Sequence, residues 1–463
     1  MNGRATLLAA AVRAVDVAAD ASARILPARP RLPAGHAAEG FAIVIPERGT
    51  PDLLDPCLAS VRAAVAQLPV PVDIVVAQNG GDPAAYDALA ARHPDVRWRH
   101  HRCALGFGGA VAMGLADVAQ DWVYLLNSDM TLAPDTLAQL LPWRDDRTFA
   151  IASQIFFVDT ARRREETGWT DFAVTAGVTE HFDREPEGTA VRGHLYAGGG
   201  ASLFRAARLR AYMATTASYA PFYFEDADWG VQAARDGLQV KFCPASRVRH
   251  VHRGTIGRYF PAGEIARIVR RNALQFELRH GFGGRADVLR DAPPSTQREL
   301  TAIGTLATML RERWKTRRAR ASGYAPELAC ASTYAAAFAP ELPNVMIVVP
   351  ADGATGDGTL DLDALARRCA ALAGHANAIL VTDHPALCMA IPLEGLPGFA
   401  AIHRVAPGER TRLAARRFAR HVEWWRRCYD ATVRVAPLRA GGNDPTTAPP
   451  LQGAHRCEPG GVR

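Results

Sequence analysis

Two acidic motifs roughly a hundred residues apart hold the side chains best suited to chemistry. The first is Asn-Ser-Asp at 127–129, which ends the apolar run 122–126. The second is Glu-Asp-Ala-Asp-Trp at 225–229, and His-Val-His follows at 250–252. A carboxylate at the end of an apolar strand lies at the rim of an α/β sheet, where such sheets bind ligands. One such carboxylate can hold a divalent cation, and another can take the proton of an attacking hydroxyl.

The order of these motifs resembles the inverting family 2 glycosyltransferases of GT-A fold. In that family the first motif is Asp-x-Asp or Asn-x-Asp, and the second is Glu-Asp-x-Asp-Leu followed by Arg and Gly. The resemblance implies that Asp226 is the general base and that Asp129 and His252 bind Mg²⁺ or Mn²⁺. His250 competes with His252 for the metal. His252 is favoured because Arg-Gly-Thr at 253–255 matches the family's His followed by small residues.

Further segments extend the resemblance. Leu-Gly-Phe-Gly-Gly-Ala at 105–110 resembles the family's stretch that passes the nucleotide. The Gly-rich segment 196–205 resembles the family's strand that lines the donor sugar and the acceptor, and Arg271-Asn272 matches an Arg-Asn pair in the family's closing helix. The two strand ends after 45 and 77 depart from the family's usual residues, so the nucleobase preference does not follow. The implied donor-binding residues are Pro46, Glu47, Gln78, Asn79, Gly106, Gly108, Asn127 and Asp129. Those expected to line the sugar and acceptor are Gly199, Gly200, Glu225, Asp228 and Trp229.

The resemblance implies transfer of a sugar from a nucleotide diphosphate sugar to a hydroxyl of a saccharide or lipid-linked glycan, as in bacterial surface polysaccharide synthesis. The motifs are most similar to those of rhamnosyltransferases. Inversion of the anomeric centre is expected because one carboxylate is enough for a direct displacement of the leaving phosphate. A retaining double displacement would need a second side chain as nucleophile, and none is identifiable.

The alternative is a catalytically inactive sugar-nucleotide-binding or scaffold protein; the presence of both Asp129 and Asp226 favours the enzyme. An oxidoreductase is disfavoured because no apolar strand precedes the glycines at 106–109. Asp228 has a second interpretation as a helix cap.

Apolar strands and amphipathic helices must position these residues. Their alternation predicts a parallel sheet in a GT-A type nucleotide-sugar-binding α/β domain over 41–282. The predicted strands are 41–46, 72–77, 96–100, 122–126, 151–158, 201–204 and 240–243. The predicted helices are 51–68, 84–92, 109–118, 228–236 and 267–280.

Four further segments complete the predicted organisation. Residues 1–40 form an Ala-rich helix and a Pro-rich linker, and 283–333 form a basic helical linker. Residues 334–440 form a second, smaller Rossmann-like α/β unit without assignable chemistry, and 441–463 form a disordered tail. In the second unit the expected strands are 345–349, 378–381 and 400–405, and the expected helices are 360–372 and 410–427.

Composition narrows the partners and the compartment. Lys plus Arg exceed Asp plus Glu by 54 to 47, which favours anionic ligands and does not argue for nucleic acid. The basic cluster within 311–320 predicts either peripheral contact with an anionic membrane or a solvated helical face.

Eight cysteines without a C-x-x-C pair argue against a zinc site and a dense disulfide framework. Charged residues interrupt the apolar N-terminal stretch, which disfavours a signal peptide, and no spanning helix is predicted. We therefore expect a cytoplasmic protein, peripheral at the inner face of the cytoplasmic membrane if it touches lipid.

Overall fold

The structure, a computed structural model, describes most of the chain. It covers residues 3–435 except 32–39, 117, 160, 162–164, 176–177, 187, 282–288, 290–291, 327–329, 352–364, 366, 368, 393–394, 397 and 406–410. The predicted linkers and the predicted helix 360–372 fall partly outside these residues. The predicted tail 441–463 falls wholly outside them.

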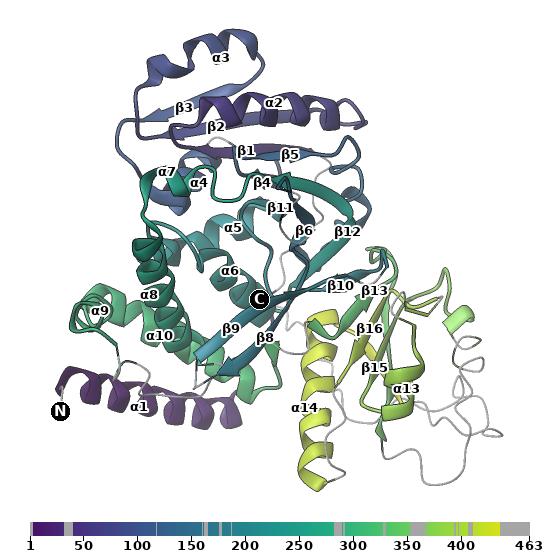
Figure 1. Cartoon of the computed structure of the whole chain (residues 1–463). Helices are drawn as coiled ribbons and strands as arrows, with labels where there is room; N and C mark the ends of the chain where they lie inside the picture. The colour runs from purple at the N-terminus through teal and green to yellow at the C-terminus, as the bar shows by residue number, and fades with distance from the viewer. Residues whose placement is uncertain are drawn as a thin grey trace, which may run out of the picture.

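One large mixed sheet forms the centre of the protein (Figure 1). Its strands run in the order β3-β2-β1-β4, all parallel, followed by antiparallel β11 and then by β6, β12 and β10. Two short strands pair at its margin, β5 with β12 and β7 with β6. The strands are β1 (Phe41–Glu47), β2 (Val72–Asn79), β3 (Arg97–His101), β4 (Trp122–Leu126), β5 (Met130–Leu132), β6 (Thr148–Phe157), β7 (Glu165–Thr167), β10 (Val191–Gly193), β11 (Ala201–Arg205) and β12 (Gln239–His250). The parallel pairing predicted for the strands at 41–46, 72–77, 96–100 and 122–126 is confirmed, whereas the sheet as a whole is mixed because β11 runs antiparallel to both of its neighbours.

Helices cover both faces of the first strands, which explains their continuous apolar sequence. Ile43 and Ile45 of β1 pack in one core cluster with α2, and Val44 packs in another with α4. A Cβ on Gly114 of α4 would lie 2.4 Å from Val44 Cγ1, so this helix approaches the sheet closely. The helices are α2 (Pro51–Val65), α3 (Asp87–Arg92), α4 (Gly106–Leu115), α5 (Ala206–Tyr212), α6 (Glu225–Arg235), α7 (Ile256–Tyr259) and α8 (Ala262–His280), with 3₁₀ turns η1 (Pro83–Tyr86), η2 (Leu141–Trp143) and η3 (Met213–Tyr219). Because α4 starts at Gly106, three residues before the predicted start, the Gly-rich segment forms its first turn.

A hairpin that the sequence analysis did not predict extends from the sheet toward α8 and α10 (Figure 1). It consists of β8 (Trp169–Thr175) and β9 (Val178–Arg184), which pair antiparallel along their whole length. Thr179 Oγ1 donates to Glu277 Oε2 of α8 at 2.7 Å, and Trp169 Nε1 donates to the Gly193 carbonyl at 2.9 Å. The hairpin is therefore fixed to the main domain at both strands.

Helix α1 (Gly3–Ile25) lies along α10 (Ile303–Ala321), near the short α9 (Pro294–Leu300) (Figure 1). Arg313 of α10 is buried and pairs with Asp16 of α1, and Arg317 pairs with Asp20, both at 2.7 Å. Other basic side chains that were predicted to form a lipid-binding or solvated face also have partners within the chain. Lys315 pairs with Glu312, Arg318 donates to the Leu26 carbonyl, and Arg320 donates to the Gly281 carbonyl. Arg313, Arg317 and Arg318 thus attach α1 and the residue that follows it, whereas Lys315 and Arg320 have partners in α10 and after α8. Among the described residues, no helix is long and apolar enough to cross a membrane.

The C-terminal unit, drawn in yellow-green in Figure 1, continues the same sheet. Its strand β13 (Ser332–Tyr334) pairs antiparallel with β10 on one side and with β16 (Ala401–Arg404) on the other. Gln239 Nε2 also donates to the Tyr429 hydroxyl at 3.0 Å, so buried polar contacts cross between the two units. The other elements are β14 (Asn344–Val349), β15 (Asn377–Thr382), β17 (Thr432–Val435), α13 (Pro385–Ala390) and α14 (Arg412–Tyr429).

Candidate active site

A cavity with about 1080 Å³ of empty space, part of it open to solvent, lies where β1, β2 and β4 end. The start of α4, the start of α6 and the segment 250–260 enclose it. Of the residues predicted for the site, those that line the cavity are Pro46, Glu47, Asn79, Gly106, Asn127, Asp129, Gly199, Gly200, Glu225, Asp226 and His252. The two acidic motifs thus meet in one cavity, as expected for strand ends of an α/β sheet.

The end of β1 is organised by Glu47. Its buried carboxylate accepts from the Thr50 backbone N–H at 2.5 Å and from the Tyr86 hydroxyl at 2.8 Å. Asn79, at the end of β2, donates to the Glu47 carbonyl at 2.9 Å and accepts from the Leu105 N–H at 3.1 Å. These contacts join β1, β2 and the start of α4, so both residues shape the cavity wall.

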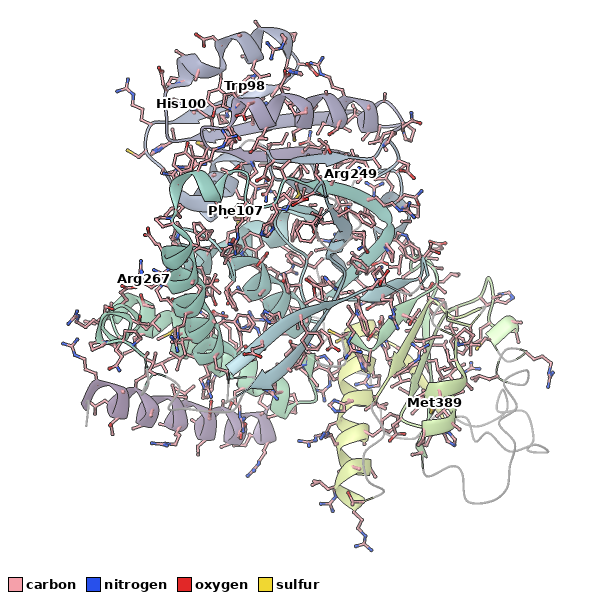
Figure 2. The ribbon with its side chains drawn as sticks, viewed as in Figure 1. Trp98, His100, Phe107, Arg249, Arg267 and Met389 are labelled. Atoms are coloured by element: carbon pink, nitrogen blue, oxygen red, sulfur yellow. The ribbon has the colours of Figure 1, made fainter. Side chains whose placement is uncertain are left out.

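Glycines allow close approach of the backbone around the cavity. Gly106 has φ +72°, and a Cβ there would lie 2.8 Å from the Pro221 carbonyl oxygen. A Cβ on Gly199 would lie 2.7 Å from the ring of Phe107, which is labelled in Figure 2. A Cβ on Gly200 would lie 2.8 Å from Asn127 Nδ2. Any larger residue at these positions would displace a wall of the cavity.

Asp129 is buried beside an imidazole. Its Oδ2 accepts from the Thr255 N–H at 3.1 Å, and its Oδ1 lies 3.2 Å from His250 Nε2 without accepting a hydrogen bond. His250 reaches this position because it pairs with Met130 in the β5–β12 ladder. His252, which the sequence analysis favoured as the ligand, also lines the cavity, but its ring centroid lies 6.0 Å from that of His250.

The side chains around Asp129 can provide some of the ligands of a divalent cation. The orphaned Asp129 Oδ1 and the neighbouring imidazole are donor atoms that suit Mn²⁺ or Mg²⁺. Within the described residues, no three His, Cys, Asp or Glu side chains converge on one point. A cation here would therefore take most of its ligands from a pyrophosphate and water.

Two arginines in the cavity wall were not predicted. The Arg48 guanidinium lies 4.1 Å from the ring centroid of Tyr259, and a Cβ on Gly49 would collide with the Tyr259 hydroxyl. Arg253 lines the cavity directly after His252. The net positive charge of the chain predicts positively charged side chains at the site but not which ones, because Tyr259, which contacts Arg48, is more than two hundred residues from it in the chain.

Asp226 lies in the first turn of α6 and lines the same cavity. Its Oδ2 accepts from the Gly199 N–H at 3.3 Å. Burial raises the pKa of Asp226, and burial together with the adjacent Asp226 charge raises the pKa of Glu225 to about 8. A carboxylate with a raised pKa accepts a proton more readily, which suits a general base.

The backbone before Asp226 is strained and clamped. Tyr223 and Phe224 have φ of +74° and +75°, values that non-glycine residues rarely adopt. Buried Asn272 of α8 holds this loop, because its Nδ2 lies within 2.7–3.0 Å of the carbonyls of residues 219, 222 and 223. Such strain tends to gather at functional sites. The Arg271-Asn272 pair noted in the sequence therefore supports the loop that presents Asp226.

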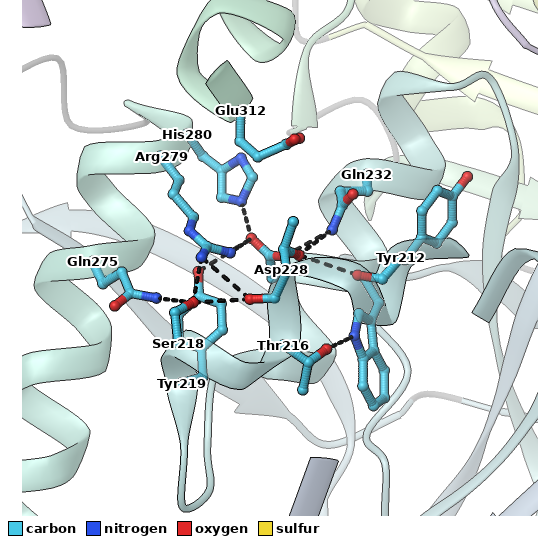
Figure 3. A network of polar contacts seen from close by, with 12 residues as sticks. Tyr212, Thr216, Ser218, Tyr219, Asp228, Gln232, Gln275, Arg279, His280 and Glu312 are labelled. Atoms are coloured by element: carbon cyan, nitrogen blue, oxygen red, sulfur yellow. Dashed lines mark hydrogen bonds and ion pairs between the residues drawn. The ribbon is translucent and has the colours of Figure 1, made fainter. Parts of the chain in front are cut away.

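Asp228 does not line the cavity, contrary to the prediction. It is fully buried in a polar network (Figure 3), where Arg279 Nη1 and His280 Nε2 lie 3.2 and 2.7 Å from its Oδ1. Thr215, Tyr219 and Gln232 donate to it as well. Burial alone would raise the pKa of Asp228, but the Arg279 charge and the His280 hydrogen bond outweigh it and lower that pKa. Asp228 therefore joins α6 to α8.

Three other predicted site residues also lie outside the cavity lining. Trp229 is buried and donates through Nε1 to Thr216 Oγ1 at 2.8 Å. Gly108 packs against the same residue, since a Cβ there would lie 2.2 Å from Thr216 Cγ2. Gln78 is buried and bonds to His100. These residues support the cavity wall without lining it, because neighbouring residues fill the space around them.

Comparisons with known proteins show what the chain is similar to. Residues 38–264 match the family model described as "Glycosyltransferase like family 2". This part of the chain, just under half of its length, is therefore similar to glycosyltransferase family 2 domains, and it has a mixed α/β fold of GT-A-like type. Among solved structures, the crystal structure of GalNAc-T7 with UDP, GalNAc and Mn²⁺ is similar, with 14% identity and a TM-score of 0.45. That similarity covers 59% of this chain and 54% of that protein. No curated protein matches the sequence.

Proposed function

We propose that the protein is an inverting glycosyltransferase that moves a sugar from a nucleotide diphosphate sugar to a hydroxyl of a saccharide or lipid-linked glycan. One observation supports this most: Asp226, with a raised pKa, lines the same cavity as Asp129. The motif likeness suggests a rhamnosyl donor and a role in bacterial surface polysaccharide synthesis. A lipid-linked acceptor would bring the enzyme to the inner face of the cytoplasmic membrane.

The donor would bind along the strand ends. Asp129, with His250 or His252 beside it, would hold a divalent cation, which when bound neutralises charge on the leaving pyrophosphate. Arg48 and Arg253 would add positive charge at the same cavity. The glycines at 106, 199 and 200 leave room for the sugar close to the backbone.

Asp226 would then act on the acceptor. As the acceptor oxygen bonds to the anomeric carbon, its proton passes to an Asp226 oxygen, and the bond from that carbon to the diphosphate breaks. Attack from the face opposite the leaving group inverts the anomeric centre. The Gly199 N–H, 3.3 Å from Asp226 Oδ2, orients the carboxylate.

Asp226→Asn tests this role. We expect turnover to fall by roughly two to four orders of magnitude, because the amide keeps the shape but cannot take the proton. Donor affinity should stay nearly unchanged. Release of nucleoside diphosphate from a panel of nucleotide sugars provides the measurement, and Asp87→Asn, on an exposed first turn of α3, is the matched control. Near-normal turnover of the variant, or retention of the anomeric configuration, would refute the mechanism.

Asp129→Ala tests the donor side separately. Because a metal ligand contributes in both the ground and transition states, we expect weaker donor binding as well as a lower rate. Calorimetric titration of the donor with and without Mn²⁺ measures the binding term. Full wild-type turnover in excess chelator, or donor affinity unchanged by the substitution, would remove the metal from the mechanism. A wild-type protein that binds donors without turning any of them over would favour the scaffold alternative.

A further inference from the structure

A second cavity lies on the far side of Asp226. It has about 1010 Å³ of empty space, part of it open to solvent. Tyr223, Asp226 and Arg253 line both this cavity and the first one. These three residues therefore form the boundary between the two spaces.

The boundary is built from unusual backbone. Tyr223 and Arg253 have φ of +74° and +57°, and Phe224 beside them has +75°. Asp430 is the other non-glycine residue with positive φ among those described, and it ends a helix in the C-terminal unit. Left-handed conformations of this kind persist only where the surrounding structure holds them, and they gather at functional sites. The strain places Asp226 where it is reached from both cavities.

Aromatic rings and neutral imidazoles form one wall of the second cavity. Tyr196 lies between two histidines, with ring centroids 5.6 Å from His181 and 6.0 Å from His194. Burial lowers the pKa of His181 to about 4 and that of His194 to about 3, so both are uncharged at neutral pH. His181 comes from β9 of the hairpin, and its buried Nε2 has no hydrogen-bond partner. The wall thus offers flat rings and one unused polar atom.

Charge is scarce in this cavity. Among the described lining residues, Asp226 is the one carboxylate and Arg253 the one cation, and both lie at the boundary with the first cavity. A sugar carboxylate or a phosphate placed deep in the cavity would therefore lose its hydration without gaining a partner of opposite charge. A purely apolar chain would leave the His181 Nε2 unpaired. An uncharged pyranose has a ring face to lie on the aromatic wall and hydroxyls to pair with that nitrogen.

We infer that the second cavity binds the acceptor and that the unit it holds is an uncharged sugar ring, with its nucleophilic hydroxyl against Asp226. This inference rests on the proposed function, in which Asp226 takes the acceptor proton. It assigns the β8–β9 hairpin to acceptor recognition, because His181 lies on β9 and Thr170 of β8 also lines the cavity. The donor is held elsewhere, at the strand ends.

Binding of methyl pyranosides tests the inference without requiring turnover. The probes are two neutral compounds, methyl rhamnoside and methyl glucoside, and two anionic ones, methyl glucuronide and methyl glucoside 6-phosphate. Saturation-transfer NMR measures their binding to the full chain in the presence of a nucleoside diphosphate and Mn²⁺. We expect the neutral compounds to bind and the anionic ones to bind at least 10-fold more weakly.

His181→Phe provides the second measurement. It keeps a ring of similar shape but removes the Nε2, so neutral pyranosides should bind about 10-fold more weakly, as expected for one lost hydrogen bond. Nucleoside diphosphate affinity should stay at the wild-type value, which also shows that the variant is folded. His375→Phe, exposed in the C-terminal unit, is the matched control and should change neither affinity.

The two hypotheses fail in different ways. Preference for the anionic pyranosides, absence of pyranoside binding, or pyranoside affinity unchanged by His181→Phe would overturn the acceptor assignment, even if the enzyme releases nucleoside diphosphate. Failure to release nucleoside diphosphate from any nucleotide sugar would overturn the proposed function, even if pyranosides bind as expected.

Discussion

The buried ion pair behind Asp226 should dominate the stability of the α6–α8 junction. Asp228 and Arg279 are both fully buried, and His280, Thr215 and Gln232 complete the network around the carboxylate (Figure 3). Asp228→Asn keeps the size of the side chain but removes its charge. The Arg279 guanidinium is then left in the interior without a counter-charge.

The magnitude follows from that uncompensated charge. Removing one partner of a buried ion pair typically costs about 3–5 kcal/mol, whereas an exposed or half-exposed pair contributes about 0–1 kcal/mol. We therefore expect Asp228→Asn to lower the free energy of unfolding by about 3–5 kcal/mol at pH 7. Asp52→Asn, which removes the exposed ion pair with Arg258, should cost less than about 1 kcal/mol. Since the pKa of Asp228 is lowered from 3.8, the stabilisation is present above that pH and is lost as the pH falls below it.

Urea unfolding followed by circular dichroism measures these differences, and a double-mutant cycle with Arg279→Met isolates the pair. The cycle should give a coupling energy of about 1–3 kcal/mol, because the second substitution removes the charge that the first leaves unpaired. A loss below about 1 kcal/mol for Asp228→Asn, or a coupling energy near zero, would show that the network contributes little and that the junction is held by apolar packing.

Two further substitutions test the loop and the acidic cluster. Glu225→Gln should flatten the pH dependence of stability. In the wild type, the folded protein keeps a proton on Glu225 up to about pH 8, whereas the unfolded chain releases that proton above about pH 4.5. The wild type therefore loses stability as the pH rises between these two values, and the variant should not. Parallel urea midpoints of the two proteins at pH 5 and pH 8 would contradict this. Asn272→Ala should cost about 1–3 kcal/mol, because three carbonyls lose their donor, and should lower turnover more than donor affinity. Equal effects on kcat and donor binding would argue against a positioning role.

Local patterns in the sequence were sufficient for the elements that carry the site. Asp129 follows a buried apolar strand, and the sheet places it at the rim as the pattern predicts. The β8–β9 hairpin was missed although a signal existed, since Thr- and aromatic-rich runs flank Ala-Gly at 176–177. The preference for His252 over His250 rested on neighbouring residues. The contact of His250 with Asp129 depends on the pairing of β5 with β12, which sequence spacing does not reveal.

The two aspartates of α6 show most clearly what sequence spacing leaves open. Asp226 and Asp228 are two residues apart, so the helix turns their side chains about 200° from each other, and one must face away from whatever the other faces. Their spacing alone provides no reason to choose between them, because both are carboxylates in a first helical turn, and the expectation for Asp226 came from the family resemblance. The choice is made by residues more than fifty positions later: Arg279 and His280 of α8 provide charge and a hydrogen bond for Asp228 and hold it in the interior. Asp226 is left at the cavities with only backbone donors, where its pKa rises. The same long-range packing thus buries one carboxylate in an ion pair and leaves the other at the cavity wall, where the proposed function needs a proton acceptor.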